Sequence, residues 1–255
     1  SFAKYLDKDK YNIYVLTLEA LKTDNYPIIP GVTVIREPNH YFFKRATFKS
    51  NEGFIFHNFK ALYNLFLTKA GIDPYTGWVK KSIKAAEQII EEYQIDVVIS
   101  SYGPISPHLV GLSIKKMKGN QIKWIADMRD EFSTNENVPF AARSCSKRIS
   151  MLEKEILAHC DAVTSVSKPI LESFKNKSLN KQCIFKEIRN GYDFEIPINK
   201  PKKNNNTFEI LYAGSFYGDV KPDIFFQALV ELNNSIKYKF EILGSNPDVI
   251  YIPKA

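Results

Sequence analysis

The sequence predicts an α/β protein built on parallel β-sheets, and three observations carry that prediction. Short apolar segments alternate with amphipathic segments between residues 96 and 189. The alternation resumes at residue 208, after a stretch rich in Lys, Asn and Pro. Polar or glycine residues stand where several of the apolar segments end. Short apolar strands alternating with helices are typical of a parallel sheet wound with right-handed crossovers.

The individual elements follow from local composition and periodicity. Strands are expected where β-branched and aromatic residues cluster between turn residues, over residues 11–17, 32–36, 96–101, 122–128, 161–167, 183–189, 208–213, 238–243 and 249–252. Apolar residues at helical spacing predict helices over residues 58–69, 77–93, 106–117, 143–159, 169–175 and 223–233. Residues 1–6 look like the end of a helix, so we expect a strand and a loop to precede them.

We expect two domains joined by a linker. Residues 1–196 form the first domain, whose first strand is missing. Residues 197–207 have the Pro, Lys and Asn composition of a linker. Residues 208–255 begin a second domain that is too short to be complete. The chain is therefore expected to be clipped at both ends.

Composition and charge restrict the classes of function. A formal net charge of +7 and a pI of about 9.1 indicate either an anionic partner or the general basicity of a Lys-rich protein. Three cysteines without C-x-x-C spacing argue against a disulfide framework and a zinc site, and fit a reducing cytoplasm. No apolar stretch approaches the roughly 18–20 residues of a spanning helix. The lysines are scattered and no nucleic-acid motif is present, so we expect no nucleic-acid partner.

Several catalytic motifs are absent from the sequence. It contains no G-x-S-x-G, no G-x-x-x-x-G-K, no H-E-x-x-H and no complete G-x-G-x-x-G. These absences count against a serine hydrolase, a P-loop ATPase, a zinc protease and standard dinucleotide binding.

Polar residues gather where the predicted strands end, which is where ligands bind in open parallel sheets. Asp127, Arg129 and Asp130 end the strand over residues 122–128 and are the strongest candidates. Carboxylates can orient hydroxyl groups, and a guanidinium can bind phosphate in a bidentate fork. The alternative is an Arg–Asp ion pair that holds the following loop in place.

Other strand ends add weaker candidates in the first domain. Ser101 and Gly103 follow the strand over residues 96–101. His108 lies near the start of the next helix, where it is either a donor to a ligand or a capping or surface histidine. Asn190 and Gly191 form a turn between the two predicted sheets, and that turn is either a hinge or the floor of a cleft.

In the second domain, Gly214 and Ser215 follow the strand over residues 208–213. Glycine permits close approach of a phosphate to backbone N–H groups, and Lys221 supplies a cation nearby. A single glycine is also ordinary in a turn between a strand and a helix.

Residues 41–60 interleave aromatic and basic side chains. Such a segment can lie at a bilayer interface and attract anionic lipid, which would make a peripheral membrane contact. The alternative is that these aromatic residues form a core beneath a long loop.

Four loose motifs follow one another along the chain: Trp124 to Asp130, Glu153 with residues 161–167, Arg189 to Asp193, and Leu211 to Gly218. In that order they resemble the GT-B glycosyltransferases of the large family-four type, which act in bacterial surface polysaccharide synthesis. The resemblance covers nearly the whole chain from about residue 97 onward.

The resemblance implies a twin Rossmann-like architecture: a complete N-terminal domain on the acceptor side and the first part of a second, nucleotide-sugar-binding domain. It also implies transfer with retention of configuration and without a bound metal or cofactor, the nucleotide sugar being a substrate. Asp127, Arg129 and Asp130 match the motif that faces the donor sugar and are the catalytic candidates. The remaining candidates divide into a donor-binding set, Asn190, Gly191, Gly214, Ser215 and Lys221, and an acceptor-side set, Ser101, Gly103 and His108.

The sequence also departs from the pattern of that family. Phe216 and Tyr217 stand where an arginine is typical, and Arg129 stands where many members have histidine. The glycine-rich loop after the first strand and the acidic pair separated by seven residues are not in this sequence. We therefore expect this polypeptide to be inactive as it stands, although it derives from an enzyme.

The expected function is transfer of a sugar from a nucleotide sugar to a surface polysaccharide or a lipid-linked acceptor, in the cytoplasm or at the membrane surface. The alternative is a non-catalytic nucleotide-sugar-binding module or partner subunit.

Overall fold

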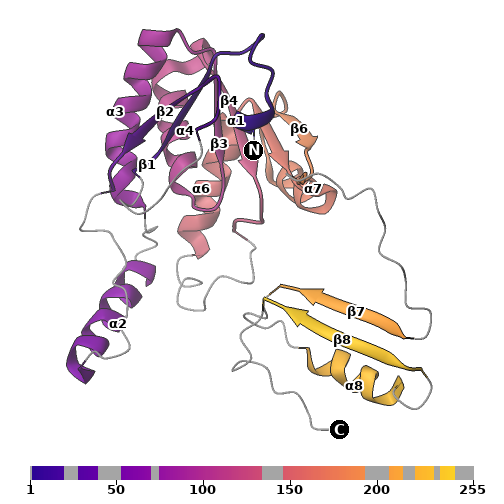
Figure 1. Ribbon diagram of the computed structural model, residues 1–255. Helices are drawn as coiled ribbons and strands as arrows, with labels where there is room; N and C mark the ends of the chain where they lie inside the picture. The colour runs from indigo at the N-terminus through magenta and orange to yellow at the C-terminus, as the bar shows by residue number, and fades with distance from the viewer. Residues whose placement is uncertain are drawn as a thin grey trace. The chain divides into compact units, whose positions relative to one another are not determined.

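A computed structural model describes residues 2–19, 28–39, 53–69, 75–133, 146–192, 207–214, 222–232 and 236–244 (Figure 1). The chain divides into two compact units, Ser1–Gly191 and Tyr192–Ala255. Parts of the predictions lie outside the described residues, namely the strand over 249–252, residues 143–145 of one helix, residues 41–52, most of the linker, Ser215 and Lys221.

The larger unit is organised around a four-stranded sheet. Its strands are β3 (Val97–Ser101), β4 (Lys123–Met128), β5 (Ala162–Ser165) and β6 (Ile184–Glu187). They pair side by side in the order β3-β4-β5-β6, and every pairing is parallel. The predicted α/β class with parallel sheets is confirmed, and this sheet is consistent with a Rossmann-like fold.

Helices connect these strands, as the alternation in the sequence predicts. They are α4 (Ser106–Lys118) with the 3-10 turn η2 (Gly119–Gln121) between β3 and β4, α6 (Ser146–His159) before β5, and α7 (Lys168–Lys177) between β5 and β6. Figure 1 shows α4 and α6 running alongside the sheet. Pro107 and Pro169 lie in the first turns of α4 and α7, where a missing N–H costs no hydrogen bond.

The core of this unit lies on one face of the sheet. Trp124, Ala126 and Met128 alternate along β4 and are fully buried, because a strand directs every second side chain to the same face. They pack with apolar residues of the connecting helices, including Leu112 and Ile156. Gly111 permits the close approach of α4, since a Cβ there would lie 2.4 Å from Trp124 Nε1.

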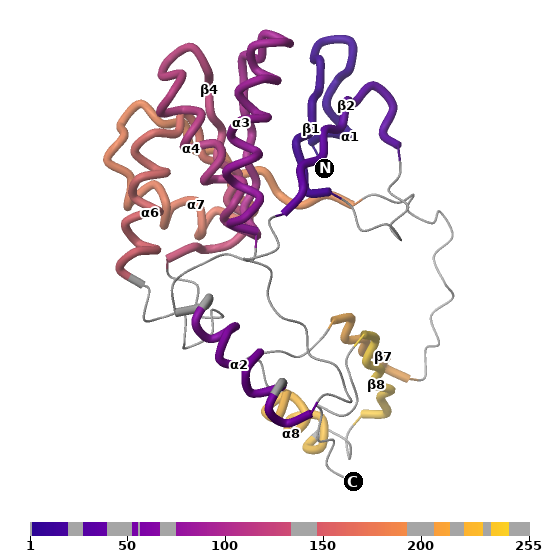
Figure 2. The backbone as a smooth tube through the Cα atoms, turned by 90° about the vertical axis from the view of Figure 1, so that its left-hand side faces the viewer, coloured from indigo at the N-terminus to yellow at the C-terminus, as the bar shows by residue number. Residues whose placement is uncertain are grey.

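The N-terminal part of the chain forms a separate two-stranded parallel sheet. It contains α1 (Phe2–Tyr5), β1 (Ile13–Leu18) and β2 (Val32–Glu37), and α3 (Thr76–Tyr93) packs against it. Within the described residues, β1 and β2 pair with each other and not with β3. Side-chain contacts attach this sheet instead: Trp78 donates its indole N–H to the Thr17 carbonyl at 3.4 Å, and Tyr14 stacks on Tyr93. Figure 2 shows this pair of strands beside α3.

The helix α2 (Phe54–Lys69) begins one turn earlier than predicted. The Gly53 carbonyl accepts the His57 N–H at 3.1 Å, so the aromatic run that starts at Phe54 is already helical. No helix in the described part of the chain is both long and apolar enough to cross a bilayer.

The smaller unit contains β7 (Phe208–Ala213), α8 (Asp223–Leu232) and β8 (Tyr238–Leu243). The two strands are parallel and in register over their whole length. Phe225 and Phe226 of α8 lie with their rings 5.4 and 5.6 Å from the ring of Phe240 on β8. This strand–helix–strand unit agrees with the elements predicted from the sequence.

Candidate functional site

Polar side chains meet at the carboxyl edge of the four-stranded sheet. The register pairs Ser101 of β3 with Asp127 of β4, and Asp127 with Thr164 of β5. Residues paired in this way point to the same face of a sheet, so the three side chains form one row. This row lies on the face opposite to Trp124, Ala126 and Met128.

Asp127 is the centre of this row. Its side chain is 2 % exposed. Its Oδ2 accepts the Ser101 hydroxyl proton at 2.8 Å and its Oδ1 accepts the Thr164 hydroxyl proton at 2.7 Å. A buried carboxylate must be compensated by donors, and hydrogen bonds to a charged acceptor are stronger than neutral ones. Both oxygens of Asp127 are thus occupied by donors from neighbouring strands.

Arg129 extends the network toward solvent. Its Nη1 lies 3.8 Å from Asp127 Oδ2, and its Nη2 donates to the side-chain carbonyl of Asn190, beyond the end of β6. The side chain remains 42 % exposed. A guanidinium carries five N–H donors, so Arg129 retains donors for an anionic ligand while two nitrogens are engaged.

The structure therefore brings together four of the residues singled out in the sequence: Ser101, Asp127, Arg129 and Asn190. The ion pair proposed as the alternative for Asp127 and Arg129 is present, and it coexists with an exposed guanidinium. Asp130 and Gly191 are exposed at the same edge. Gly103, also exposed, has a φ of +89°, a left-handed conformation that favours glycine.

A buried carboxylate of α6 fixes the loop that follows β4. Glu153 is 1 % exposed, and its two oxygens accept the backbone N–H of Ser133 at 2.9 Å and the Ser133 hydroxyl proton at 2.8 Å. Lys177 of α7 lies 3.0 Å from Glu153 Oε1. Phe132 is buried in the core beside this clamp. Glu153 and Phe132 thus set the path of the loop that carries Arg129 and Asp130.

His108 lies in the interior rather than at a capping or surface position. Trp124 Nε1 donates to Ser100 Oγ at 2.8 Å, and Ser100 Oγ lies 2.6 Å from His108 Nδ1. An indole N–H can only donate, so the Ser100 hydroxyl oxygen accepts from Trp124, and the direction of its bond with Nδ1 follows the tautomer of His108. Burial lowers the pKa of His108 to about 3, so the ring is neutral. Its Nε2 has no hydrogen-bond partner among the described residues.

In the smaller unit, two glycines end the paired strands. Gly214 follows β7 with a φ of +151°, and Gly244 follows β8 with a φ of +103°. The Gly214 N–H donates to the Leu243 carbonyl at 2.9 Å, and a Cβ on Gly244 would lie 3.4 Å from the Gly214 carbonyl oxygen. The predicted contacts of Ser215 and Lys221 fall outside the described residues.

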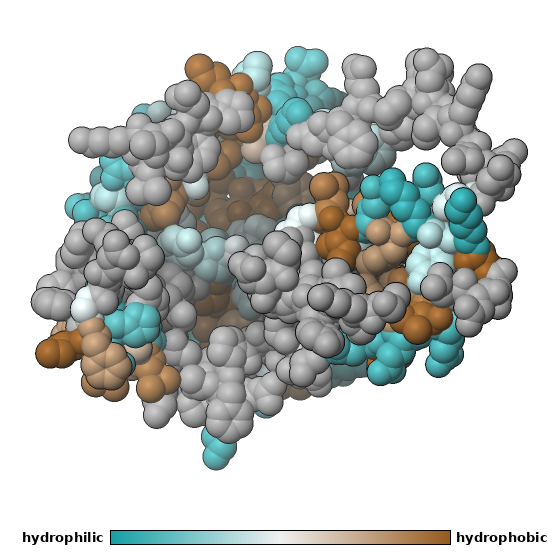
Figure 3. All heavy atoms as spheres, turned by 60° about the horizontal axis from the view of Figure 1, so that its bottom comes forward, coloured by the Kyte–Doolittle hydropathy of each residue, from teal (hydrophilic) through white to brown (hydrophobic). Residues whose placement is uncertain are grey.

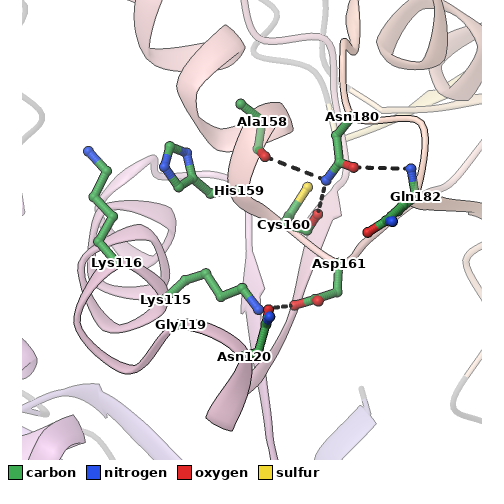
Figure 4. Close-up of a pocket in the computed structure, with 10 residues that line it drawn as sticks. All are labelled: Lys115, Lys116, Gly119, Asn120, Ala158, His159, Cys160, Asp161, Asn180 and Gln182. Atoms are coloured by element: carbon green, nitrogen blue, oxygen red, sulfur yellow. Dashed lines mark hydrogen bonds and ion pairs between the residues drawn. The ribbon is translucent and has the colours of Figure 1, made fainter.

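A hollow of about 400 Å³ lies at the opposite, amino-terminal edge of the four-stranded sheet (Figure 4). Figure 4 shows that its polar groups bind one another: Lys115 pairs with Asp161 at 2.7 Å, and Asn180 donates to the Ala158 and Cys160 carbonyls. Ligands of open parallel sheets bind at the carboxyl edge, so we place the candidate site there and not in this hollow.

No group of three or more His, Cys, Asp or Glu side chains could hold a metal ion in the part of the chain that the structure describes. Cys160 and Cys183, both buried, are free thiols with their sulfurs 3.7 Å apart.

The sequence-based predictions omitted Thr164, Glu153 as a clamp, and Gly244. Glu153 lies between Ile149, Leu152 and Ile156 of α6, and a charge within an apolar stripe signals a buried ion pair. The strand β8 is followed by Gly244 and Ser245, which repeats the pair Gly214 and Ser215 after β7. Thr164 could be found only from the register that aligns it with Asp127.

No protein-family model matches this chain, and no curated protein matches it either.

Proposed function

We propose that this protein is a glycosyltransferase that moves a sugar from a nucleotide sugar to a glycan or lipid-linked acceptor. The observation that supports it most is the Asp127–Arg129–Asn190 network at the carboxyl edge of β4 and β6. Three of the motifs that resemble family-four GT-B enzymes contain or adjoin this network, Trp124 to Asp130, residues 161–167 and Arg189 to Asp193.

In this proposal the exposed guanidinium of Arg129 stabilises the leaving group of the sugar transfer. In the transfer, the bond between the anomeric carbon and the diphosphate oxygen breaks, and the nucleoside diphosphate leaves with the electron pair. The acceptor hydroxyl oxygen forms the new glycosidic bond and releases its proton. Arg129 offers donors where negative charge would develop, and preorganised donors of this kind stabilise a leaving anion.

In this proposal Asp127 positions neighbouring side chains and does not itself react with the substrate. Its oxygens already accept two hydroxyl protons and lie beside Arg129, which fixes the guanidinium and the Ser101 hydroxyl. The exposed carboxylate of Asp130 is then the group of this motif that can reach a substrate hydroxyl.

A non-catalytic nucleotide-sugar-binding module is the second candidate. It is favoured by the same occupied oxygens of Asp127, because an engaged buried carboxylate is suited to holding a loop rather than to exchanging protons.

An assay with a panel of nucleotide sugars and polyprenyl phosphate or glycan acceptors separates the two functions. Release of nucleoside diphosphate that requires both donor and acceptor, with a glycosylated product by mass spectrometry, supports the transferase and contradicts the expectation that this polypeptide is inactive. Donor binding by calorimetry without release supports the binding module. Absence of donor binding contradicts both.

A further inference from the structure

The helix α2 presents an unburied apolar stripe. Ile55, Phe59, Leu62 and Phe66 recur at spacings of four, three and four residues, which places them on one face of a helix. Their exposed fractions are 81, 70, 65 and 62 %. Figure 3 shows hydrophobic side chains gathered on the surface of this helix, at the left of the view.

The other long helices of the same unit behave differently. α3, α4, α6 and α7 each bury apolar residues, such as Trp78, Ile114, Ile156 and Phe174. None of the described side chains of α2 is buried. Contiguous exposed apolar surface of this kind marks an interaction site rather than an ordinary solvated helix.

Charge identifies the kind of partner. Residues 41–69, which end with α2, hold five Lys and Arg residues against one acidic residue, Glu52. The formal charge of this stretch is therefore +4, within a net charge of +7 for the whole sequence. Within α2 itself, Lys60 and Lys69 are the charged residues and no acidic residue is present. His57, Lys60 and Asn64 lie on the side of the helix away from the apolar stripe.

We infer that the apolar stripe of α2 lies on an anionic lipid bilayer. The aromatic and aliphatic side chains enter the boundary between headgroups and acyl chains, and the basic residues of this stretch attract anionic headgroups. The inference extends the membrane interpretation of residues 41–60 to a defined surface. It is independent of the proposed transferase activity, since a binding module would use the same surface.

Co-sedimentation with lipid vesicles tests this inference on the whole chain. The protein is expected to sediment with vesicles of phosphatidylcholine and phosphatidylglycerol in equal parts, more weakly with phosphatidylcholine alone, and more weakly at high salt. Leu62→Glu is expected to lower partitioning by about tenfold or more, because the variant loses apolar burial and gains a repelled charge.

Leu179→Glu is the matched control, because Leu179 is 91 % exposed in the turn after α7 and the substitution changes the charge equally. Partitioning of this variant is expected to stay within about twofold of the unmodified protein. Equal partitioning of the two variants, or none of the unmodified protein, overturns the inference. A change in oligomeric state of Leu62→Glu without a change in vesicle binding overturns it in favour of a second copy on this face.

A fluorescence measurement locates the contact. Trp78 and Trp124 are buried, so a tryptophan introduced by Phe59→Trp reports on α2 with little background change. Its emission is expected to shift to shorter wavelength when anionic vesicles are added. An unshifted spectrum in vesicle-bound protein contradicts docking through this stripe.

Discussion

Thr164 on β5 donates its hydroxyl proton to Asp127 Oδ1 at 2.7 Å, which joins the central strand of the candidate site to its neighbour. The donor is buried as well as the acceptor, so water cannot replace this hydrogen bond. Ser101 donates to the other oxygen of the same carboxylate, but Ser101 is exposed.

The two donors are therefore expected to differ in energy. Thr164→Val keeps the shape of the side chain and leaves a buried carboxylate oxygen without a donor, which is expected to lower the free energy of unfolding by about 1.5–3 kcal/mol. Ser101→Ala is expected to cost less than about 1 kcal/mol, because water can reach the vacated position. Urea denaturation measures both, and equal losses would contradict the assigned burial.

Burial of His108 predicts a pH dependence of stability. The pKa of the folded ring is about 3 against an ordinary value of 6.5, so between these values the unfolded chain binds a proton that the folded chain does not. The free energy of unfolding is therefore expected to fall as pH falls below about 6.5, by up to about 1.4 kcal/mol per pH unit from this group.

His108→Gln is expected to flatten that slope, measured by denaturation at several pH values. His159→Gln, in the exposed last turn of α6, serves as the control and is expected to leave the slope unchanged. An unaltered slope in His108→Gln would show that another group carries the dependence.

The Glu153 clamp makes a prediction about the loop after β4. Glu153→Ala removes the acceptor of the Ser133 N–H and the partner of Lys177, and is expected to lower the free energy of unfolding by about 3 kcal/mol. Hydrogen exchange at the Ser133 amide is expected to accelerate in the same variant. Ser133→Ala retains the backbone hydrogen bond and is expected to have the smaller effect on both measurements.

Glycine positions offer a matched pair of packing tests. Gly111→Ala places a Cβ 2.4 Å from the indole nitrogen of Trp124, a fully buried ring that also donates to Ser100. This substitution is expected to cost about 1–3 kcal/mol through overpacking. Gly191→Ala meets no atom within 4 Å and is expected to be close to neutral. Thermal denaturation of the two variants checks the packing of α4 on β4, and comparable melting temperatures would contradict it.

Much of the fold follows from local sequence. The strands from β3 to β8 and their helices lie within a few residues of the predicted ranges, because short apolar runs and helical periodicity determine them locally. Local sequence does not predict that β1 and β2 form a sheet separate from β3, since strand pairing depends on contacts between residues distant in sequence. The sequence predicts the start of α2 one turn too late, because aromatic residues such as Phe54 are compatible with both loop and helix.

Local sequence also predicts part of the candidate site. Asp127, Arg129 and Asn190 could be assigned to one sheet edge from the rule on strand ends. Their mutual contacts, and the contribution of Thr164, depend on register. The sequence predicts that His108 either donates to a ligand or lies at a cap or on the surface. Its burial depends on contacts with Ser100 and Trp124, which no local pattern reveals.

We propose that a nucleotide sugar binds at the carboxyl edge of β3–β6 through Arg129. Titration calorimetry of the protein with a panel of nucleotide sugars tests it most directly, with Arg129→Gln as the variant and Arg148→Gln, an exposed arginine of α6, as the matched control. Arg129→Gln is expected to weaken binding by about tenfold or more, while Arg148→Gln stays within about twofold of the unmodified protein. Equal affinities of Arg129→Gln and the unmodified protein would contradict the account.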